Sequence, residues 1–274
     1  MKTLFSLLGI LILHVAAASP VKDSSDIYII QQLKAKAYKL ETSNAVIWFD
    51  NPVQDVAKAQ QFANDISGGI DAIEAFTGRH LDSAYYGTSK IEFFISNYTT
   101  VSHVYHGYHH NAVKGMPYIF LSAKRFERDA LPYLHETTHL ILRDFHSLWL
   151  REGMAEWVAK HVAKQLGKGH VAFYDKKEGS DAHHLTAAIL QDTRKDFVQS
   201  LVGTNGIPEF KSSEQRRLFY IASTSFVEYL SCFLTKERLM QLYAADDTKE
   251  ASEKMMGKTI EELKAEWITA VQNL

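Results

Sequence analysis

Two histidines and a glutamate in the middle of the chain have the types and the spacing of a metal site. Residues 135–139 read HETTH, which is the H-E-x-x-H arrangement. Residues four apart lie on the same face of an α-helix, so His135 and His139 can direct their imidazoles at one metal ion while Glu136 lies beside it. This geometry suits zinc.

A second segment is needed to support the motif, because a chain with 13 histidines in 274 residues contains an H-E-x-x-H by chance in roughly a few per cent of cases. Residues 149–157 read WLREGMAEW and start another helical pattern about a dozen residues after His139, far enough for the chain to turn and return antiparallel. Glu152 could then complete the coordination shell. Two His, one Glu and a position for water make a catalytic zinc site, whereas structural zinc sites are usually closed by four ligands and rich in Cys. This chain has one Cys.

Together, HETTH and WLREGMAEW resemble the gluzincins, the metallopeptidase group that includes thermolysin and the zinc aminopeptidases, and most closely the bacterial peptidase MA-like families. The resemblance implies that His135, His139 and Glu152 bind one zinc ion and that Glu136 is the general base. It also implies that Glu156, one turn after Glu152, hydrogen-bonds His135 and raises its basicity. The reverse assignment, with Glu156 as the ligand and Glu152 in support, stays open because both lie on one helix face.

A tetrahedral oxyanion needs a second electrophile beside the metal, and Tyr220 is the candidate. It leads the segment YIASTSFVEYL at residues 220–230, which resembles a tyrosine-led helix that packs near the zinc in peptidase MA-like proteins. Tyr174, His170 and Tyr229 are alternatives for this role. Tyr220 could equally be an aromatic residue of the core.

The elements that must position these residues predict an α+β fold. Residues 45–49 and 90–96 are short apolar runs that predict strands, and a helical pattern runs between them from Asn51, as its N-cap, to Gly78. Residues 116–123 predict a third strand; by resemblance it lies at a sheet edge, where an extended peptide can add backbone hydrogen bonds. The metal helix is expected from residue 128 or 129 to about 145.

The remainder of the chain is predicted to be mainly helical. The helix that carries Glu152 should continue to about Leu166, where Gly167 and Gly169 stop it, and another should cover residues 183–203. Three amphipathic segments follow, and Thr259 and Glu262 form a capping box at the start of the last one. These segments are residues 214–234, 236–246 and 259–274.

The predicted architecture is a single zincin-like catalytic domain at residues 19–274. Its N-terminal lobe, about residues 26–146, combines a small mixed sheet with helices. Its C-terminal lobe, about residues 147–274, is helical, and the zinc site lies in the cleft between the lobes. A domain of this composition, with 46% hydrophobic and 23% charged residues, should have a well-filled core.

Residues 1–18 have the layout of a secretory signal peptide: a lysine at position 2, an apolar run, and small residues near the end. The run falls short of the roughly 20 residues that span a bilayer, which disfavours a membrane anchor. We therefore expect a secreted or periplasmic protein. The formal net charge of −2 gives no electrostatic reason to expect nucleic acid or an anionic membrane as a partner.

Two further features of the sequence have less specific interpretations. The segment 99–112 holds four histidines among aromatic residues, but their irregular gaps favour a substrate-contacting loop or plain surface over a second metal site. Cys232 lies in the apolar stretch FVEYLSCFL, which predicts a buried side chain. The four histidines are His103, His106, His109 and His110.

The leading hypothesis is an exported zinc metallopeptidase that cleaves a peptide or protein substrate, with zinc-activated water and Glu136 as general base. One alternative is a catalytically silent zincin-fold binding or assembly factor of the cell envelope. Another is that HETTH belongs to an ordinary amphipathic core helix. That alternative would leave Glu152 and Glu156 unpaired in a largely apolar segment, which is energetically unfavourable.

Overall fold

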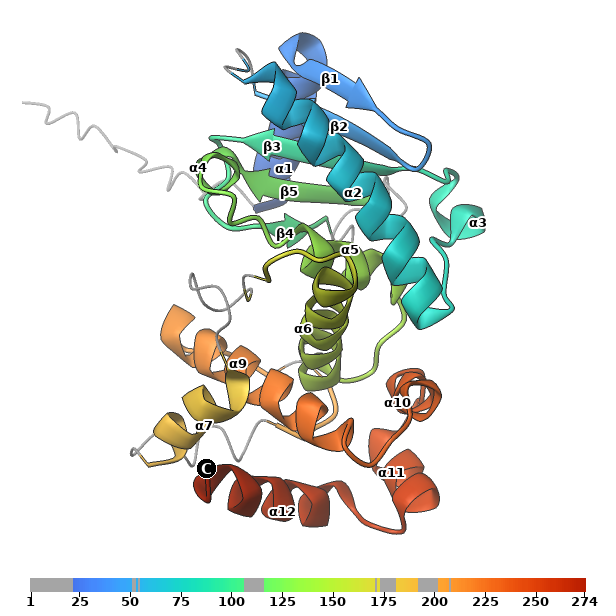
Figure 1. Cartoon of the computed structure of the whole chain (residues 1–274), viewed down its shortest axis with the longest axis vertical. Coiled ribbons are helices and arrows are strands. Elements are labelled where there is room, and N and C mark those ends of the chain that lie inside the picture. Colours follow the sequence, from blue (N-terminus) through green and yellow to red (C-terminus); the bar gives the residue numbers. More distant parts are fainter. Residues whose placement is uncertain are drawn as a thin grey trace, which may run out of the picture.

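The computed structural model describes residues 22–50, 53, 55–105, 116–170, 172, 181–191, 202–206 and 208–274. Within this part of the chain, a five-stranded mixed sheet with helices forms the N-terminal part and the C-terminal part is mostly helical, as Figure 1 shows. The predicted signal peptide lies outside the described residues, as do Tyr174 and three of the clustered histidines, His106, His109 and His110.

The sheet has the strand order β1-β2-β3-β5-β4. Strands β2, β3 and β5 are parallel, while β1 and β4 pair antiparallel at the two edges. The strand predicted at residues 116–123 is present, but it is not at the edge, because β4 pairs with its outer side. A strand of two residues is too short to leave an alternating pattern. The strands are β1 (Tyr38–Glu41), β2 (Ala45–Phe49), β3 (Ile91–Ser96), β4 (His103–Val104) and β5 (Tyr118–Ser122).

Helices cover both faces of the sheet. Alternate residues of a strand point to opposite faces, and in β3 Phe94 packs with α1 (Lys22–Lys36), whereas Phe93 belongs to the core shared with α2 (Val56–Thr77). The N-cap of α2 is Asp55, whose side chain accepts a hydrogen bond from the Lys58 amide; the expected cap at Asn51 was therefore wrong.

The helix that carries HETTH is shorter than the sequence suggested. The chain passes from β5 into α4 (Ala123–Glu127) and then turns at Asp129, whose φ of 53° is incompatible with a continuing right-handed helix. Helix α5 (Tyr133–Ile141) begins only after this turn. It ends at Leu142, whose carbonyl accepts a hydrogen bond from the Tyr243 hydroxyl. The expected bounds, 128 or 129 to about 145, were therefore too wide.

The C-terminal part packs around α6 (Leu148–Gln165), whose expected end near Leu166 is confirmed: Leu166 is the C-cap, and Gly167 is left-handed. Helix α7 (Ala182–Leu190) covers the first part of the helix expected at residues 183–203; residues 192–201 lie outside the described residues, and residues 202–206 are not helical. Helix α11, which has its own N-cap at Asp247, was not predicted. The helices are α6 (Leu148–Gln165), α7 (Ala182–Leu190), α9 (Ser213–Leu230), α10 (Lys236–Tyr243), α11 (Thr248–Met256) and α12 (Ile260–Gln272).

Two local predictions in this part have opposite outcomes. The capping box is present: the Thr259 hydroxyl accepts from the Glu262 amide, and the Glu262 carboxylate accepts from the Thr259 amide. Cys232, expected to be buried, is exposed, because α9 ends before it at Leu230. Among the described residues, no helix has both the length and the apolar character needed to cross a bilayer.

Candidate metal centre

Helices α5 and α6 lie in the middle of the molecule, between the sheet and the C-terminal helices (Figure 1). Every residue of α5 from Leu134 to Ile141 is buried, because α2 packs on one side and α6 on another. The contact with α2 is close at Gly69, where an added Cβ would lie 2.8 Å from Leu134 Cδ2. The candidate centre thus lies on two helices, α5 and α6, that pack against each other and against α2.

The structure brings together the three residues that the sequence marked as metal ligands. The Nε2 atoms of His135 and His139 are 3.0 Å apart. Glu152 Oε2 lies 3.4 Å from the first nitrogen and 3.3 Å from the second. All three side chains are buried. Among the described residues they form a group that could hold a metal ion.

The spacing of these three atoms fits zinc. In a tetrahedral site with bonds of about 2.0–2.1 Å, neighbouring ligand atoms lie about 3.3 Å apart. The planes of the two imidazole rings are 87° apart, so the rings approach the common point from different directions. Two nitrogens and one carboxylate oxygen are also ligand types that zinc accepts in catalytic sites.

Glu136 is 2% exposed, and its Oε1 atom has no hydrogen-bond partner among the described residues. Burial raises the pKa of its carboxyl group to about 7. A group whose pKa lies near neutrality can both accept and release a proton under ordinary conditions. The pKa of Glu136 therefore suits a general base.

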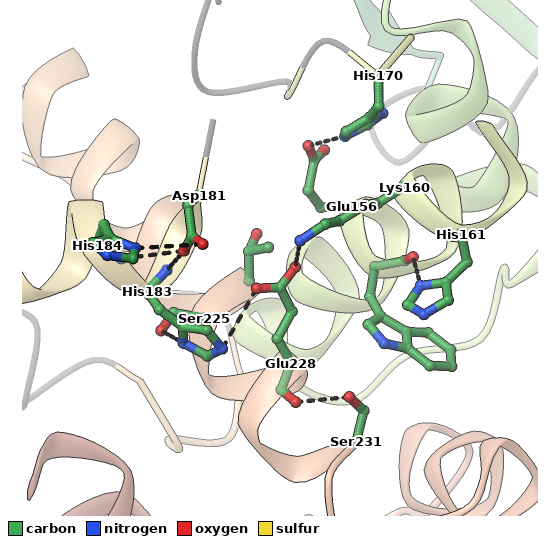
Figure 2. A network of polar contacts seen from close by, with 12 residues as sticks. Glu156, Lys160, His161, His170, Asp181, His183, His184, Ser225, Glu228 and Ser231 are labelled. Atoms are coloured by element: carbon green, nitrogen blue, oxygen red, sulfur yellow. Dashed lines mark hydrogen bonds and ion pairs between the residues drawn. The ribbon is translucent and has the colours of Figure 1, made fainter. Parts of the chain in front are cut away.

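Glu156 hydrogen-bonds the opposite side of His135. Its Oε2 lies 2.9 Å from His135 Nδ1, and its Oε1 lies 2.7 Å from His170 Nε2, a contact that Figure 2 shows. Burial alone would raise the pKa of Glu156, but the hydrogen bonds from the two histidines lower it to about 2. As a carboxylate it accepts the Nδ1 proton of His135, so Nε2 is the nitrogen that faces His139 and Glu152 and that could coordinate a metal ion once its own proton has left.

These contacts distinguish the two glutamates. Glu152 lies beside both Nε2 atoms, whereas Glu156 contacts Nδ1 of His135. Burial alone would raise the pKa of Glu152, but the neighbouring His139 and His135 lower it well below its usual value. The structure therefore places Glu152 with the two Nε2 atoms, as the candidate third ligand, and Glu156 on the Nδ1 side of His135.

The candidates for the oxyanion-stabilising group lie in different surroundings. Tyr220 is on α9, which packs against α6, and burial followed by the charge of Glu152 raises the pKa of its hydroxyl. Tyr229 is farther along α9, and its hydroxyl donates to Glu266 Oε2 at 3.4 Å. His170 contacts Glu156, which lies on the Nδ1 side of His135, opposite the Nε2 atom that faces His139 and Glu152. Among the described candidates, Tyr220 is thus the one whose hydroxyl pKa is raised by the charge of Glu152.

His103 is a neighbour of the centre that sequence reasoning did not place there. It lies on β4, which contacts α5, and its Nε2 is 3.1 Å from Asp26 Oδ1. Its Nδ1 lies 2.9 Å from the Val101 carbonyl oxygen. Burial alone would lower the pKa of His103, but these two contacts raise it, and the resulting charge favours the ionised form of Glu136. The strand is too short for any sequence pattern to have shown this proximity.

No protein-family model and no curated protein matches this chain. Its chemistry therefore has to be argued from the site itself. In the described part of the chain, the site consists of a possible ligand triad, an adjacent buried carboxyl group and a hydrogen-bonded support for one of the histidines.

Proposed function

We propose that the protein is an exported zinc-dependent metallopeptidase of the gluzincin type, with a zincin-like catalytic domain at residues 19–274. The observation that carries the proposal is the convergence of His135 Nε2, His139 Nε2 and Glu152 Oε2 at zinc-ligand spacing, next to the buried Glu136. Export is proposed from the signal-like layout of residues 1–18, which suggests the periplasm or the extracellular space.

When bound, zinc supplies Lewis acidity that makes water a nucleophile near neutral pH and polarises the carbonyl group to be attacked. Glu136 accepts a proton from the attacking water and transfers it to the amine leaving group. The Tyr220 hydroxyl donates a hydrogen bond to the oxyanion. Glu156 holds His135 in the tautomer that keeps its Nε2 lone pair available for coordination. A peptide or protein is thus the proposed substrate.

The test compares residues 19–274 of the wild type with Glu152→Ala and Glu136→Gln. Zinc content is measured by elemental analysis, and hydrolysis is measured with a peptide library. We expect about one zinc ion per wild-type chain, retention of zinc with loss of hydrolysis in Glu136→Gln, and loss of both in Glu152→Ala. His184→Ala is the control, because this side chain is 71% exposed on α7.

The result that would overturn the proposal is a wild-type protein that holds no zinc after zinc has been supplied. The alternative of a binding or assembly factor of the cell envelope, whose metal site is vestigial, would then take its place. A protein that binds zinc through the triad but cleaves no peptide in the library would retain the metal centre and lose the peptidase assignment.

A further inference from the structure

We infer that His170 is a positioning residue for the metal centre: it fixes the carboxylate of Glu156 and, through it, the imidazole of His135. This inference rests on the proposed function, because its consequence is a change in zinc affinity. It concerns a histidine in the loop after α6, outside the HETTH and WLREGMAEW segments.

In the described part of the chain, each oxygen of Glu156 lies within hydrogen-bond distance of an imidazole. Oε2 accepts from His135 Nδ1 at 2.9 Å, and Oε1 lies 2.7 Å from His170 Nε2. The Glu156 carboxylate is only 2% exposed and His170 is 18% exposed, so the second contact lies at the border between the buried centre and solvent. A carboxylate held at both oxygens cannot rotate without breaking a charge-assisted hydrogen bond.

The loop after α6 turns back, so that His170 contacts Glu156, which lies 14 positions earlier in the chain. Gly167 adopts a φ of +64°, a left-handed conformation that ends α6, and the Lys168 amide donates to the Ala163 carbonyl at 2.9 Å. The Lys168 ammonium group forms an ion pair with Asp65 of α2. The left-handed Gly167 and the backbone hydrogen bond of Lys168 turn the chain back along α6, which brings the His170 imidazole beside Glu156.

A cavity of about 160 Å³ lies beside the loop and limits the loss of zinc affinity expected when the His170 imidazole is removed. His135, His170, Lys168 and Asp65 are among the residues that line it. If the His170 imidazole is removed, water can enter and hydrogen-bond Glu156, but water does not hold the carboxylate in one orientation. The loss should therefore be smaller than the 10–100-fold typical when a direct partner of a ligand histidine is removed.

The first test measures zinc affinity by competition with a chelator for the wild type, His170→Ala, His170→Gln and Lys168→Ala. The amide of glutamine can reach the position of Nε2 and donate to Glu156. We expect an affinity loss on the order of three- to tenfold in His170→Ala, below the range for a direct partner, and recovery in His170→Gln. Lys168→Ala, which removes the loop's ion pair and leaves the imidazole, should stay within about twofold of the wild type.

The inference is overturned if His170→Ala binds zinc as tightly as the wild type, or if Lys168→Ala loses as much affinity as His170→Ala. The first result would mean that Glu156 keeps its position without His170. The second would assign the effect to the loop as a whole and not to the imidazole.

The second test needs no metal. In the metal-free wild type, the Nδ1 proton of His135 should give a downfield, slowly exchanging imidazole resonance, because Glu156 accepts it in a buried site. We expect this resonance to broaden or disappear in His170→Ala and to persist in His170→Gln. If the wild type bound no zinc, the proposed function would fail, and an unchanged resonance in His170→Ala would separately refute the positioning role.

Discussion

The protonation of His135 decides how readily the centre can take up a metal ion. Burial alone would lower the pKa of this imidazole, but the hydrogen bonds to Glu152 and Glu156 outweigh burial and raise it to about 10. His139 differs, since burial lowers its pKa to about 4. At neutral pH both nitrogens of the metal-free His135 are therefore protonated, and a metal ion must displace the proton on Nε2.

We predict that zinc affinity rises with pH between pH 6 and 8 and that at least one proton is released per zinc ion. The sign follows from the pKa of His135: lower pH favours the protonated imidazole, which cannot coordinate, and the competition weakens as pH rises toward about 10. Isothermal titration calorimetry in two buffers with different ionisation enthalpies counts the protons. Zinc uptake without proton release would contradict a protonated His135.

Tyr220 can be tested by removing only its hydroxyl group. We predict that Tyr220→Phe lowers kcat by roughly 10²-fold, as for other single oxyanion donors, and leaves KM and zinc content near wild-type values. Phenylalanine keeps the half-buried ring in place, so the change reports on the hydroxyl group. Steady-state kinetics on a peptide cleaved by the wild type provides the measurement.

Tyr229→Phe is the matched control for this prediction, because Tyr229 lies on the same helix and its hydroxyl contacts Glu266. It should leave kcat unchanged. Equal activity of both variants and the wild type would assign Tyr220 to the core and leave the electrophile to another group.

At the scale of elements, the position of α9 on α6 depends on Gly153, the residue after the candidate ligand Glu152. A Cβ at this position would lie 2.5 Å from the Ser223 carbonyl oxygen and 2.6 Å from Val227 Cγ2. The first neighbour is backbone, which cannot move aside as the end of a flexible side chain can. The two helices can therefore approach this closely only because residue 153 has no side chain.

We predict that Gly153→Ala destabilises the fold by about 1–3 kcal/mol, because the helices must separate to admit the methyl group. Denaturant unfolding followed by circular dichroism measures the change. Gly68→Ala is the matched control: it lies in the middle of α2 with open space around the position of a Cβ, so it should be neutral or stabilising by up to about 1 kcal/mol. Equal stability of Gly153→Ala and the wild type would show that α9 adjusts freely.

The features that sequence reasoning predicted correctly depend on short-range patterns. The approach of His135 to His139 follows from their spacing on one helix, and strands β2 and β3 follow from runs of apolar residues. The features that it missed depend on distant parts of the chain. The edge strand β4 is defined by its pairing with β5, and the contact of His170 with Glu156 depends on how the chain turns after α6.

The bounds of α5 show why local patterns were insufficient there. The apolar periodicity continues on both sides of the helix, but the backbone of Asp129 is left-handed before it, and the Leu142 carbonyl is bonded to Tyr243 after it. The hydroxyl of Tyr243 comes from a residue 101 positions later in the chain. No window around residue 142 contains that information.

At the scale of the whole molecule, the possible ligands belong to two helices that contact different parts of the fold. Helix α5 contacts β4 and β5 of the sheet, and α6 packs against α9. The link between them is tied to the C-terminal part: the Gly206 amide donates to the His146 carbonyl at 3.0 Å, and the Leu148 amide donates to the Gly206 carbonyl at 3.0 Å. A metal ion bound by both helices would therefore connect the sheet to the C-terminal helices.

We predict that zinc stabilises the whole chain against thermal unfolding. A ligand that binds only the folded state at 100 times its Kd contributes about 2.7 kcal/mol, and for a chain of this size each kcal/mol corresponds to roughly 2–4 °C in Tm. Differential scanning calorimetry should thus show Tm rising by about 5–10 °C on zinc addition and falling back with a chelator. Magnesium should produce no rise, because it prefers oxygen ligands in octahedral geometry.

Glu152→Ala decides whether this stabilisation comes from the proposed centre. Without its carboxylate, α6 supplies no ligand to the group formed with His135 and His139, so zinc could no longer connect the two helices. We expect the zinc-dependent rise in Tm to disappear in this variant. A rise as large as that of the wild type would place the stabilising ion at other residues, and the sheet and the C-terminal helices would then be held together by packing alone.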